Sequence, residues 1–426
     1  MNPRDIGAII RAARCAQRMT QAQLGRTCGY SASAISRVEG GTLRLSEQSL
    51  LLMTRTLGIP VDAIRASRPA TLAPDMTLDQ EDAMRRRQLL LAGMAATGAS
   101  MIPSSAFAAT RPDSSTQIVR ALYEPESSAS ISLRQLRQFL AEAHSQFTAA
   151  QYQDLGEALP GLLGTAQATR DAMSGRSREE AQAQVARAWI LATELALKQH
   201  SDVAWPAADR ALAAAQASGD PVVEGEAARV LAITMRRAGR PAAGVDLLRR
   251  TAGSLAQNRD TVSRAVGATL LMTAAYTAAC GRRRSDALDL MTGAADAVAR
   301  LSGTSTQPRE RLFTVDATAA QADLYWIGVH TALGTPDEAV PYAARIVPGQ
   351  LPTVERRARY GTDCARMWQR LGDHRRTLEA LRFTEQVAPE ELRRPALRAL
   401  TAELLYAPVT VAGVREFAER TGAPPQ

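Results

Sequence analysis

Apolar residues recur every three or four positions over the first 65 residues of the chain, which is the spacing of amphipathic helices. Polar residues, glycine or proline separate each short apolar group from the next. The inward positions of five predicted helices are Ile6, Ile10 and Ala13; Leu24; Ile35 and Val38; Leu50, Met53 and Leu57; and Val61 and Ile64. The pattern therefore predicts a compact all-α domain of five short helices.

Capping and turn residues mark the ends of the second and third of these helices. Thr20 and Gln23 have the spacing of a capping box, which starts a helix by satisfying its first backbone N–H groups. Gly29 ends that helix, Ser31 opens the next one, and Gly40 closes it. Two short helices joined by such a tight turn form a helix-turn-helix, whose second helix can enter the major groove of DNA.

From Ser115 onward the chain reads as one helix after another, without the alternation of a β-strand. Short turns separate the helices at intervals of roughly 40 residues, with one wider gap. The turns are Lys198 to Asp202, Gly239 to Pro241, Gly281 to Arg284, Gly334 to Pro336, and Gly372 to Asp373. A repeat of two antiparallel helices of this length predicts an α-solenoid with a concave surface.

Composition and charge agree with this pattern. Aromatic residues make up 4% of the chain, and alanine and leucine dominate the apolar residues, which favours helices over a β-sandwich or barrel. A length of 426 residues indicates two or more domains. The formal net charge is +8, and residues 1–66 hold nine arginines against four acidic residues. A small basic domain is typical of proteins that bind the phosphate backbone of nucleic acids.

The N-terminal residues resemble a known family of DNA-binding domains. Between Ile6 and Ile64, many positions agree in order and spacing with the phage-repressor or XRE type of helix-turn-helix: Ile10, Arg11, Arg14, Thr20, Gln21, Leu24, Gly29, Ser31, Ile35, Ser36, Glu39 and Gly40. The resemblance implies a buried ion pair between Arg14 and Glu39. This pair would tie the first helix to the end of the recognition helix.

The same resemblance implies which residues contact double-stranded DNA. Gln21 would contact a phosphate or the adjacent base, and Arg44 would lie near the backbone or the minor groove. The full set of candidates is Thr20, Gln21, Ser31, Ala32, Ser33, Ser36, Arg37 and Arg44. Ala32 and Ser33 depart from the larger amide side chains that the family often uses. Arg37 and the shape of the DNA would therefore carry more of the specificity.

Parts of the C-terminal region resemble tetratricopeptide repeats. The matching residues are Trp326, Gly334 and 336–339 in one unit, and Trp368, 371–373 and Pro389 in the other. Residues 205–210 resemble the repeat arrays that are fused to such regulators in actinobacteria. A solenoid of this kind usually binds a peptide, small-molecule or protein effector on its concave surface. Because aromatic residues are scarce, the groove candidates are Tyr276, Trp326, His330, Tyr360 and Trp368, with packing in the core as the alternative.

Residues 67–114 are predicted to connect a DNA-binding domain at 1–66 to a sensor and dimerisation domain at 115–426. Within this connection, residues 85–108 look like a twin-arginine export signal, with an apolar run and an A-x-A pattern. Such signals stand at the N-terminus of a protein, whereas this segment follows a whole domain. The apolar run is also too short for a membrane span. We therefore expect a connecting helix, with membrane association or processing as the alternative.

Signals for catalysis and for metal binding are missing from the sequence. The four cysteines form no CxxC pair and no cluster with histidine, so a disulfide framework or a zinc site is not expected, and a reducing cytoplasm is the default. The chain also lacks a Walker loop and the HExxH and GxSxG motifs. We therefore expect neither an enzymatic activity nor a cofactor.

Together these observations predict a cytoplasmic transcription regulator that binds DNA as a homodimer and carries a helical effector-binding domain. Two alternatives from other classes remain at this point. One is a helical-repeat interaction scaffold whose DNA-binding domain is vestigial. The other is an envelope-associated protein that uses the twin-arginine-like segment.

Overall fold

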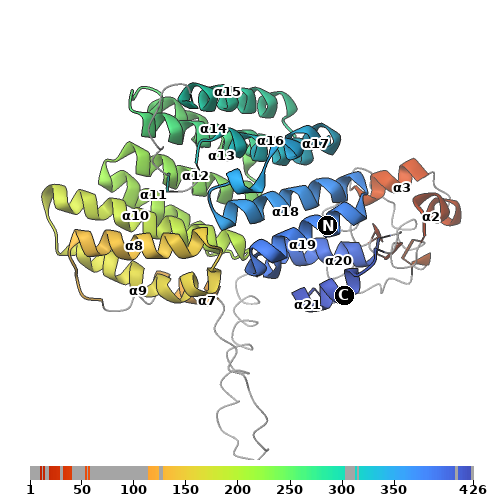
Figure 1. Cartoon of the computed structure of the whole chain (residues 1–426), viewed down its shortest axis with the longest axis horizontal. Coiled ribbons are helices and arrows are strands. Elements are labelled where there is room, and N and C mark those ends of the chain that lie inside the picture. Colours follow the sequence, from red (N-terminus) through yellow and green to blue (C-terminus); the bar gives the residue numbers. More distant parts are fainter. Residues whose placement is uncertain are drawn as a thin grey trace, which may run out of the picture. The chain divides into compact units, whose positions relative to one another are not determined.

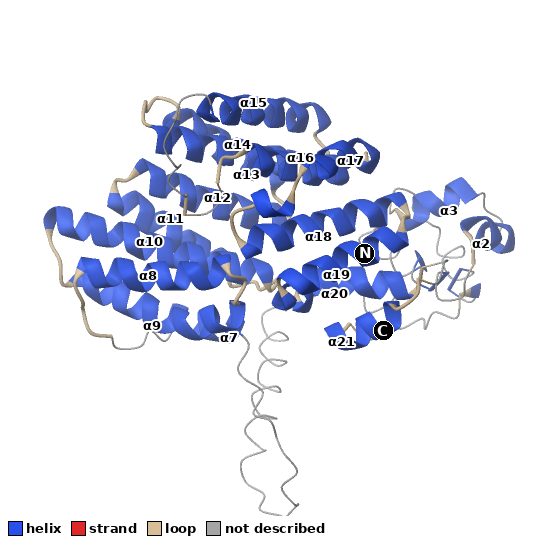
Figure 2. Cartoon of the chain, viewed as in Figure 1, coloured by secondary structure: helices blue, strands red, loops and turns tan. Residues whose placement is uncertain are grey.

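The computed structural model confirms an all-helical chain. It describes residues 10–11, 13–14, 19–28, 32–40, 53–54, 56–57, 114–123, 128–302, 312–313, 316–407 and 411–423. Every regular element within these residues is an α-helix or a 3-10 helix (Figure 2). The chain divides into two compact units, residues 1–110 and 111–426. The twin-arginine-like segment 85–108 and the predicted fifth helix around Val61 and Ile64 lie outside the described residues.

The N-terminal unit contains the two helices of the predicted helix-turn-helix, α2 (Gln21–Cys28) and α3 (Ala32–Glu39). The capping box at the start of α2 is formed: the Thr20 backbone N–H donates to Gln23 Oε1 at 2.7 Å, and the Gln23 N–H donates to Thr20 Oγ1 at 3.1 Å. Apolar side chains from the predicted inward positions form one buried cluster, which comprises Ile10, Leu24, Cys28, Ile35, Val38, Met53 and Leu57. Ile35 and Val38 bury one face of α3 in this cluster, and the opposite face, which carries the exposed Ser36, points away from the core.

In the second unit, α7 (Ser114–Tyr123) is followed by a series of helical pairs. The first part comprises α7, α8 (Leu133–Thr148), α9 (Tyr152–Asp171), α10 (Gly175–Lys198), α11 (Ala204–Ser218), α12 (Pro221–Arg237) and α13 (Pro241–Leu255). The second part comprises α14 (Thr261–Cys280), α15 (Arg284–Ser302), α16 (Ala319–Leu333), α17 (Pro336–Arg345), η2 (Pro348–Gln350), α18 (Val354–Leu371), α19 (His374–Val387), η3 (Pro389–Arg393), α20 (Pro395–Leu405) and α21 (Val414–Thr421). All five predicted turns fall between the two helices of a pair.

The pairs stack side by side, from α8 and α9 in yellow to α18 and α19 in blue (Figure 1). Each of the helices α10, α12, α14 and α16 contacts its own partner and also the first helix of the next pair. The first helices of five successive pairs, α10 to α18, therefore form a continuous inner row. An array of helical hairpins with such an inner row confirms the predicted α-solenoid.

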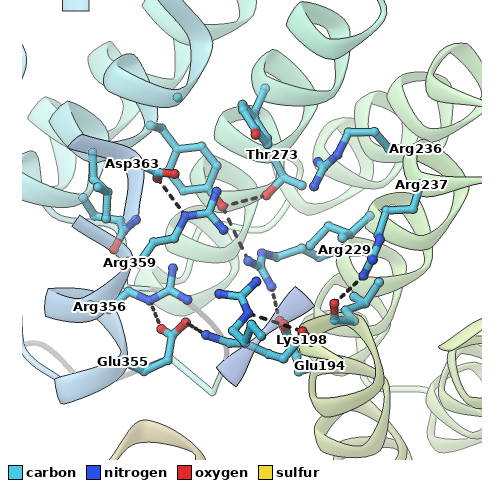
Figure 3. Close-up of a pocket in the computed structure, with 18 of the residues that line it drawn as sticks. Glu194, Lys198, Arg229, Arg236, Arg237, Thr273, Glu355, Arg356, Arg359 and Asp363 are labelled. Carbon is cyan, nitrogen blue, oxygen red and sulfur yellow. Dashed lines mark hydrogen bonds and ion pairs between the residues drawn. The ribbon is translucent and has the colours of Figure 1, made fainter. Parts of the chain in front are cut away.

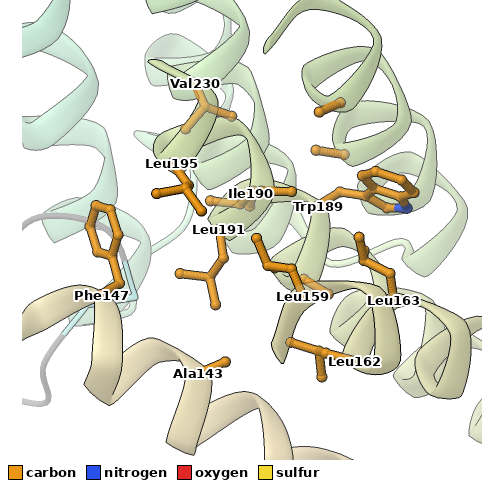
Figure 4. Close-up of a cluster of buried hydrophobic side chains, with 14 of the residues drawn as sticks. Ala143, Phe147, Leu159, Leu162, Leu163, Trp189, Ile190, Leu191, Leu195 and Val230 are labelled. Atoms are coloured by element: carbon orange, nitrogen blue, oxygen red, sulfur yellow. The ribbon is translucent and has the colours of Figure 1, made fainter. Parts of the chain in front are cut away.

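Alanine, leucine and glycine allow the helices of this array to approach closely. The largest buried cluster joins α7 to α12 around the fully buried Trp189, with leucines from α9 and α10 packed against one another (Figure 4). Gly244 in α13 lies so close to α12 that a Cβ atom at this position would be 3.0 Å from the Ala232 carbonyl oxygen. The small residue at this crossing is therefore required by the backbone spacing.

Candidate functional site

Arg14 and Glu39 form a bidentate ion pair in the N-terminal unit. Arg14 Nε lies 2.5 Å from Glu39 Oε1, and Arg14 Nη2 lies 3.0 Å from Glu39 Oε2. Both residues are 9% exposed. Arg14 also donates to the Met19 carbonyl, and the Gln21 side-chain amide donates to Glu39 Oε2 at 2.8 Å. Glu39, at the end of α3, thus binds both Arg14 and the start of α2, and Arg14 in turn binds the backbone just before α2.

The structure places only part of the expected DNA-contacting set. Thr20 and Ser36 are exposed, and the Thr20 hydroxyl accepts the capping bond described above. The amide nitrogen of Gln21 is engaged by Glu39, which orients this side chain at the first turn of α2. The side chains of Ala32, Ser33 and Arg37, and the whole of Ser31 and Arg44, lie outside the described residues. The assignment of base and phosphate contacts stays a prediction.

The second unit contains a cavity of about 250 Å³ along the inner row of helices. Residues from α10, α12, α14, α16 and α18 line it, so each of five successive helical pairs contributes to the wall. Among the described residues, eight basic side chains line this cavity against three carboxylates. The basic residues are Lys198, Arg229, Arg236, Arg237, Arg356, Arg359, Arg366 and Arg394; the acidic ones are Glu194, Glu355 and Asp363. We call this site the basic cavity.

Figure 3 shows Arg356 and Arg359, from α18, facing Arg229, Arg236 and Arg237, from α12. All three carboxylates of the wall are already engaged by its basic side chains. The pairs include Arg229–Glu194 at 2.7 Å, Arg359–Asp363 at 2.7 Å, Arg366–Asp363 at 3.4 Å and Lys198–Glu355 at 2.5 Å. The carboxylates therefore neutralise only part of the positive charge.

Arg236 and Arg237 have no carboxylate within ion-pair distance among the described residues. The Arg236 guanidinium lies over the Tyr276 ring, 4.7 Å from its centroid, and donates to Thr277 Oγ1 at 3.0 Å. Arg237 donates to the carbonyl oxygen of Leu197 at the end of α10. These neutral partners hold both guanidinium groups in place but do not neutralise them, and the charge of Asp202, beyond ion-pair distance, offsets only part of the charge of Arg237.

Of the five aromatic or histidine groove candidates, Tyr276 lines the basic cavity. The other four are placed elsewhere. Trp326 and His330 stack on each other with ring centroids 5.2 Å apart. The Tyr360 hydroxyl donates to the Ala343 carbonyl at 3.1 Å, and Trp368 packs under Arg376.

A buried network adjoins the basic cavity and contains Lys198, the only lysine of the chain. Lys198 Nζ lies 2.5 Å from Glu355 Oε1 and also binds Glu391. The Tyr152 hydroxyl donates to Glu391 Oε1 at 2.5 Å, and Arg394 Nη1 lies 2.5 Å from Glu391 Oε2. Tyr152 and Lys198 belong to α9 and α10, whereas the two glutamates belong to α18 and η3. The network therefore fastens early hairpins of the unit to its last ones.

His200 lines the basic cavity, where both burial and the nearby arginines disfavour its charged form. Partial burial, followed by the positive charges of Arg237, Arg394 and Arg366, lowers the pKa of His200 to about 4. We expect this imidazole to remain neutral at pH 6, where an ordinary histidine is mostly protonated. An NMR titration, assigned with the variant His200→Gln, should show a midpoint near pH 4. A midpoint near the usual value of about 6.5 would contradict the field described here.

Within the described residues, no helix is both long and apolar enough to cross a membrane. The same part of the chain shows no group of three or more histidine, cysteine, aspartate or glutamate side chains arranged to hold a metal ion. The N-terminal unit presents a helix-turn-helix, and the second unit presents an arginine-lined cavity.

Comparison with known proteins identifies the N-terminal part. Residues 5–66 match the family model of a helix-turn-helix domain, which confirms that prediction. No curated protein matches the chain. Among solved structures, the chain is similar to the crystal structure of Bacillus thuringiensis PlcR in complex with the peptide PapR7 and DNA, at 12% identity and a TM-score of 0.31, over 90% of this chain and 99% of that one. So distant a likeness carries no argument about the ligands of the present protein.

Proposed function

We propose that the protein is a transcription regulator that binds DNA as a homodimer and responds to an effector bound by its helical unit. The observation that carries the proposal is the helix-turn-helix domain at residues 5–66, joined to a second unit with a basic cavity. The resemblance of the N-terminal residues to the XRE type supports a role in sequence-specific binding. The repeat-like hairpins support the role of a sensor, and a cytoplasmic location follows from both roles.

Recognition of DNA would use α3 in the major groove, with α2 against the backbone. Small residues at positions 32 and 33 leave the direct reading of bases mainly to Arg37, whose guanidinium can bind a guanine edge in a bidentate manner. One such domain reads only a few base pairs. Two domains that read half-sites about one helical turn apart gain affinity and specificity, which is the reason to expect a homodimer.

The direct test is selection of bound duplexes from a random library with the full-length protein. The proposal expects one enriched motif with two related half-sites, whose affinity falls as salt rises because arginine contacts release counterions from the phosphates. A matched selection with Arg37→Ala controls for binding that is independent of α3. Enrichment of no motif by the wild-type protein would overturn the proposal.

Arg37→Ala and Arg44→Ala should have different effects on binding to the selected operator. Loss of a bidentate guanine contact should relax the preference at one position of each half-site, by about 1–3 kcal/mol. Loss of a phosphate contact at Arg44 should weaken all sequences about equally and reduce the salt slope by about one. Competition binding against single-base operator variants, at two salt concentrations, separates these results. A uniform loss of affinity for Arg37→Ala would identify Arg37 as a phosphate contact.

A further inference from the structure

We propose that the basic cavity binds a compact ligand with at least two negative charges, carried on phosphate or carboxylate groups. The inference deepens the proposed function, since this ligand would be the effector or the part of the effector that is recognised. Three independent features of the cavity support it: uncompensated charge, unpartnered buried donors, and size.

The first feature is the excess of positive charge. Arginines from α12 and α18 face one another across the cavity, while its three carboxylates are already paired (Figure 3). Neither Arg236 nor Arg237 forms an ion pair with a carboxylate among the described residues, and both lie next to the other arginines of the cavity. Burial and the charges of Arg394 and Arg236 lower the pKa of Arg237, and the opposing charge of Asp202 does not outweigh them. Like charges held this close repel one another, and an anion between them would remove the repulsion.

The second feature is a pair of buried donors without a hydrogen-bond partner. Arg229 Nε and Gln321 Nε2 are both buried and have no partner among the described residues. Arg229 is 4% exposed and Gln321 is 1% exposed, and both line the basic cavity. Buried polar groups are rarely left unsatisfied, because the lost hydrogen bonds to water are not replaced. Both atoms can only donate, so the group that satisfies them must be an acceptor.

The third feature is the size and rigidity of the site. A volume of about 250 Å³ is below the roughly 300–1,000 Å³ of pockets for drug-sized ligands, so the bound group must be compact. Guanidinium groups from both facing helices lie over the Tyr276 ring, with Arg236 at 4.7 Å and Arg359 at 5.9 Å from its centroid. The ring and the ion pairs therefore fix the arginines before a ligand arrives, which lowers the entropy lost on binding.

The test is calorimetric titration of the full-length protein with inorganic pyrophosphate and with citrate, at constant ionic strength. At least one of the two probes should bind with one site per chain, and which of them binds more tightly distinguishes phosphate from carboxylate ligands. The double variant Arg236→Gln, Arg237→Gln should bind the preferred probe at least tenfold more weakly. The matched control, Arg249→Gln with Arg250→Gln, removes the same charge from exposed positions on α13 and should bind like the wild type.

A second variant keeps the test decisive if the double variant does not fold. Gln321→Glu adds a carboxylate to the wall, so it should raise the melting temperature of the protein and weaken probe binding.

NMR gives a local readout, since binding should shift the His200 titration to higher pH. Failure of both probes to bind at 10 mM would overturn the proposal, as would equal binding by the variants or an unmoved His200 signal. No DNA is present, so failure of the proposed DNA binding would be seen separately.

Discussion

Glu39→Ala is expected to lower the free energy of unfolding of the N-terminal helix-turn-helix by about 3–5 kcal/mol. The carboxylate of Glu39 accepts two hydrogen bonds from Arg14 and one from Gln21, and its side chain is 3% exposed. Removing it takes the Glu39 charge away from the buried Arg14 guanidinium, and loss of one partner of a buried pair is more costly than the pair itself was favourable. The loss should loosen the contact between the first helix and α3.

Hydrogen–deuterium exchange of the full-length protein measures this effect locally. The free energy of the opening that lets the amides of residues 21–39 exchange should fall by the same amount as the free energy of unfolding. Exchange of the amides of the second unit should not change. Arg11→Ala, which changes an exposed residue of the same unit, is the control and should leave the exchange within about 0.5 kcal/mol of the wild type. Exchange of residues 21–39 that does not change in Glu39→Ala would show that the pair contributes little.

Lys198→Met is expected to destabilise the helical unit by about 3–5 kcal/mol. The substitution keeps the length and the apolar stem of the side chain but removes the charge that lies between Glu355 and Glu391. The two carboxylates would then face each other in a buried site, with Arg356 and Arg394 as their remaining counter-charges. Because the network joins α9 and α10 to α18 and η3, its loss should weaken the whole array rather than one hairpin.

The same network makes the helical unit sensitive to acid. Burial would raise the pKa of Glu391, but the charges of Arg394 and Lys198 outweigh it and lower this pKa from 4.5 to about 2. A carboxyl group with a depressed pKa in the folded state contributes stability above its unfolded pKa and loses it as the pH falls through the folded value. The contribution of Glu391 should therefore be present above pH 4.5 and disappear towards pH 2. In Lys198→Met this loss should begin at higher pH.

Urea unfolding of the full-length protein, followed by circular dichroism at pH 7 and at pH 4, tests both statements. The wild type should show a higher midpoint than Lys198→Met at both values. The difference should be larger at pH 7, because protonation of the glutamates in the variant at pH 4 relieves part of their repulsion. Arg249→Met removes an exposed positive charge on α13 and should unfold like the wild type. Equal midpoints for Lys198→Met and the control would contradict a structural role of the network.

Local signals in the sequence were sufficient to predict the elements of the fold. Thr20 with Gln23 defines a helix start, and the glycine-containing turns such as Gly334 to Pro336 define the hairpins, because both depend on a few neighbouring residues. The pair of Arg14 and Glu39, 25 positions apart, is implied only by the family resemblance. Contacts over such separations depend on how helices pack, which spacing alone does not determine.

The basic cavity shows what sequence patterns do not predict. Its residues span positions 194 to 394, and each arginine looks like a solvated side chain on its own helix. They converge only because the first helices of successive pairs form one inner row. Of the five candidates, Tyr276 lines the cavity, and Tyr325, which also lines it, was not among them. The sequence does single out Lys198, because it is one lysine among fifty arginines. Such an exception indicates a position where an arginine does not serve in place of lysine.

If an effector in the helical unit controls DNA binding, the affinity of the full-length protein for its selected operator should depend on that effector. Affinity is measured with and without the small-molecule fraction of a cell extract, for the wild type and for Arg236→Gln with Arg237→Gln. The extract should change the wild-type dissociation constant by about 5- to 150-fold, the usual range of coupling between two sites, and should leave that of the variant unchanged. The same dissociation constant with and without extract in both proteins would contradict control of DNA binding by an effector.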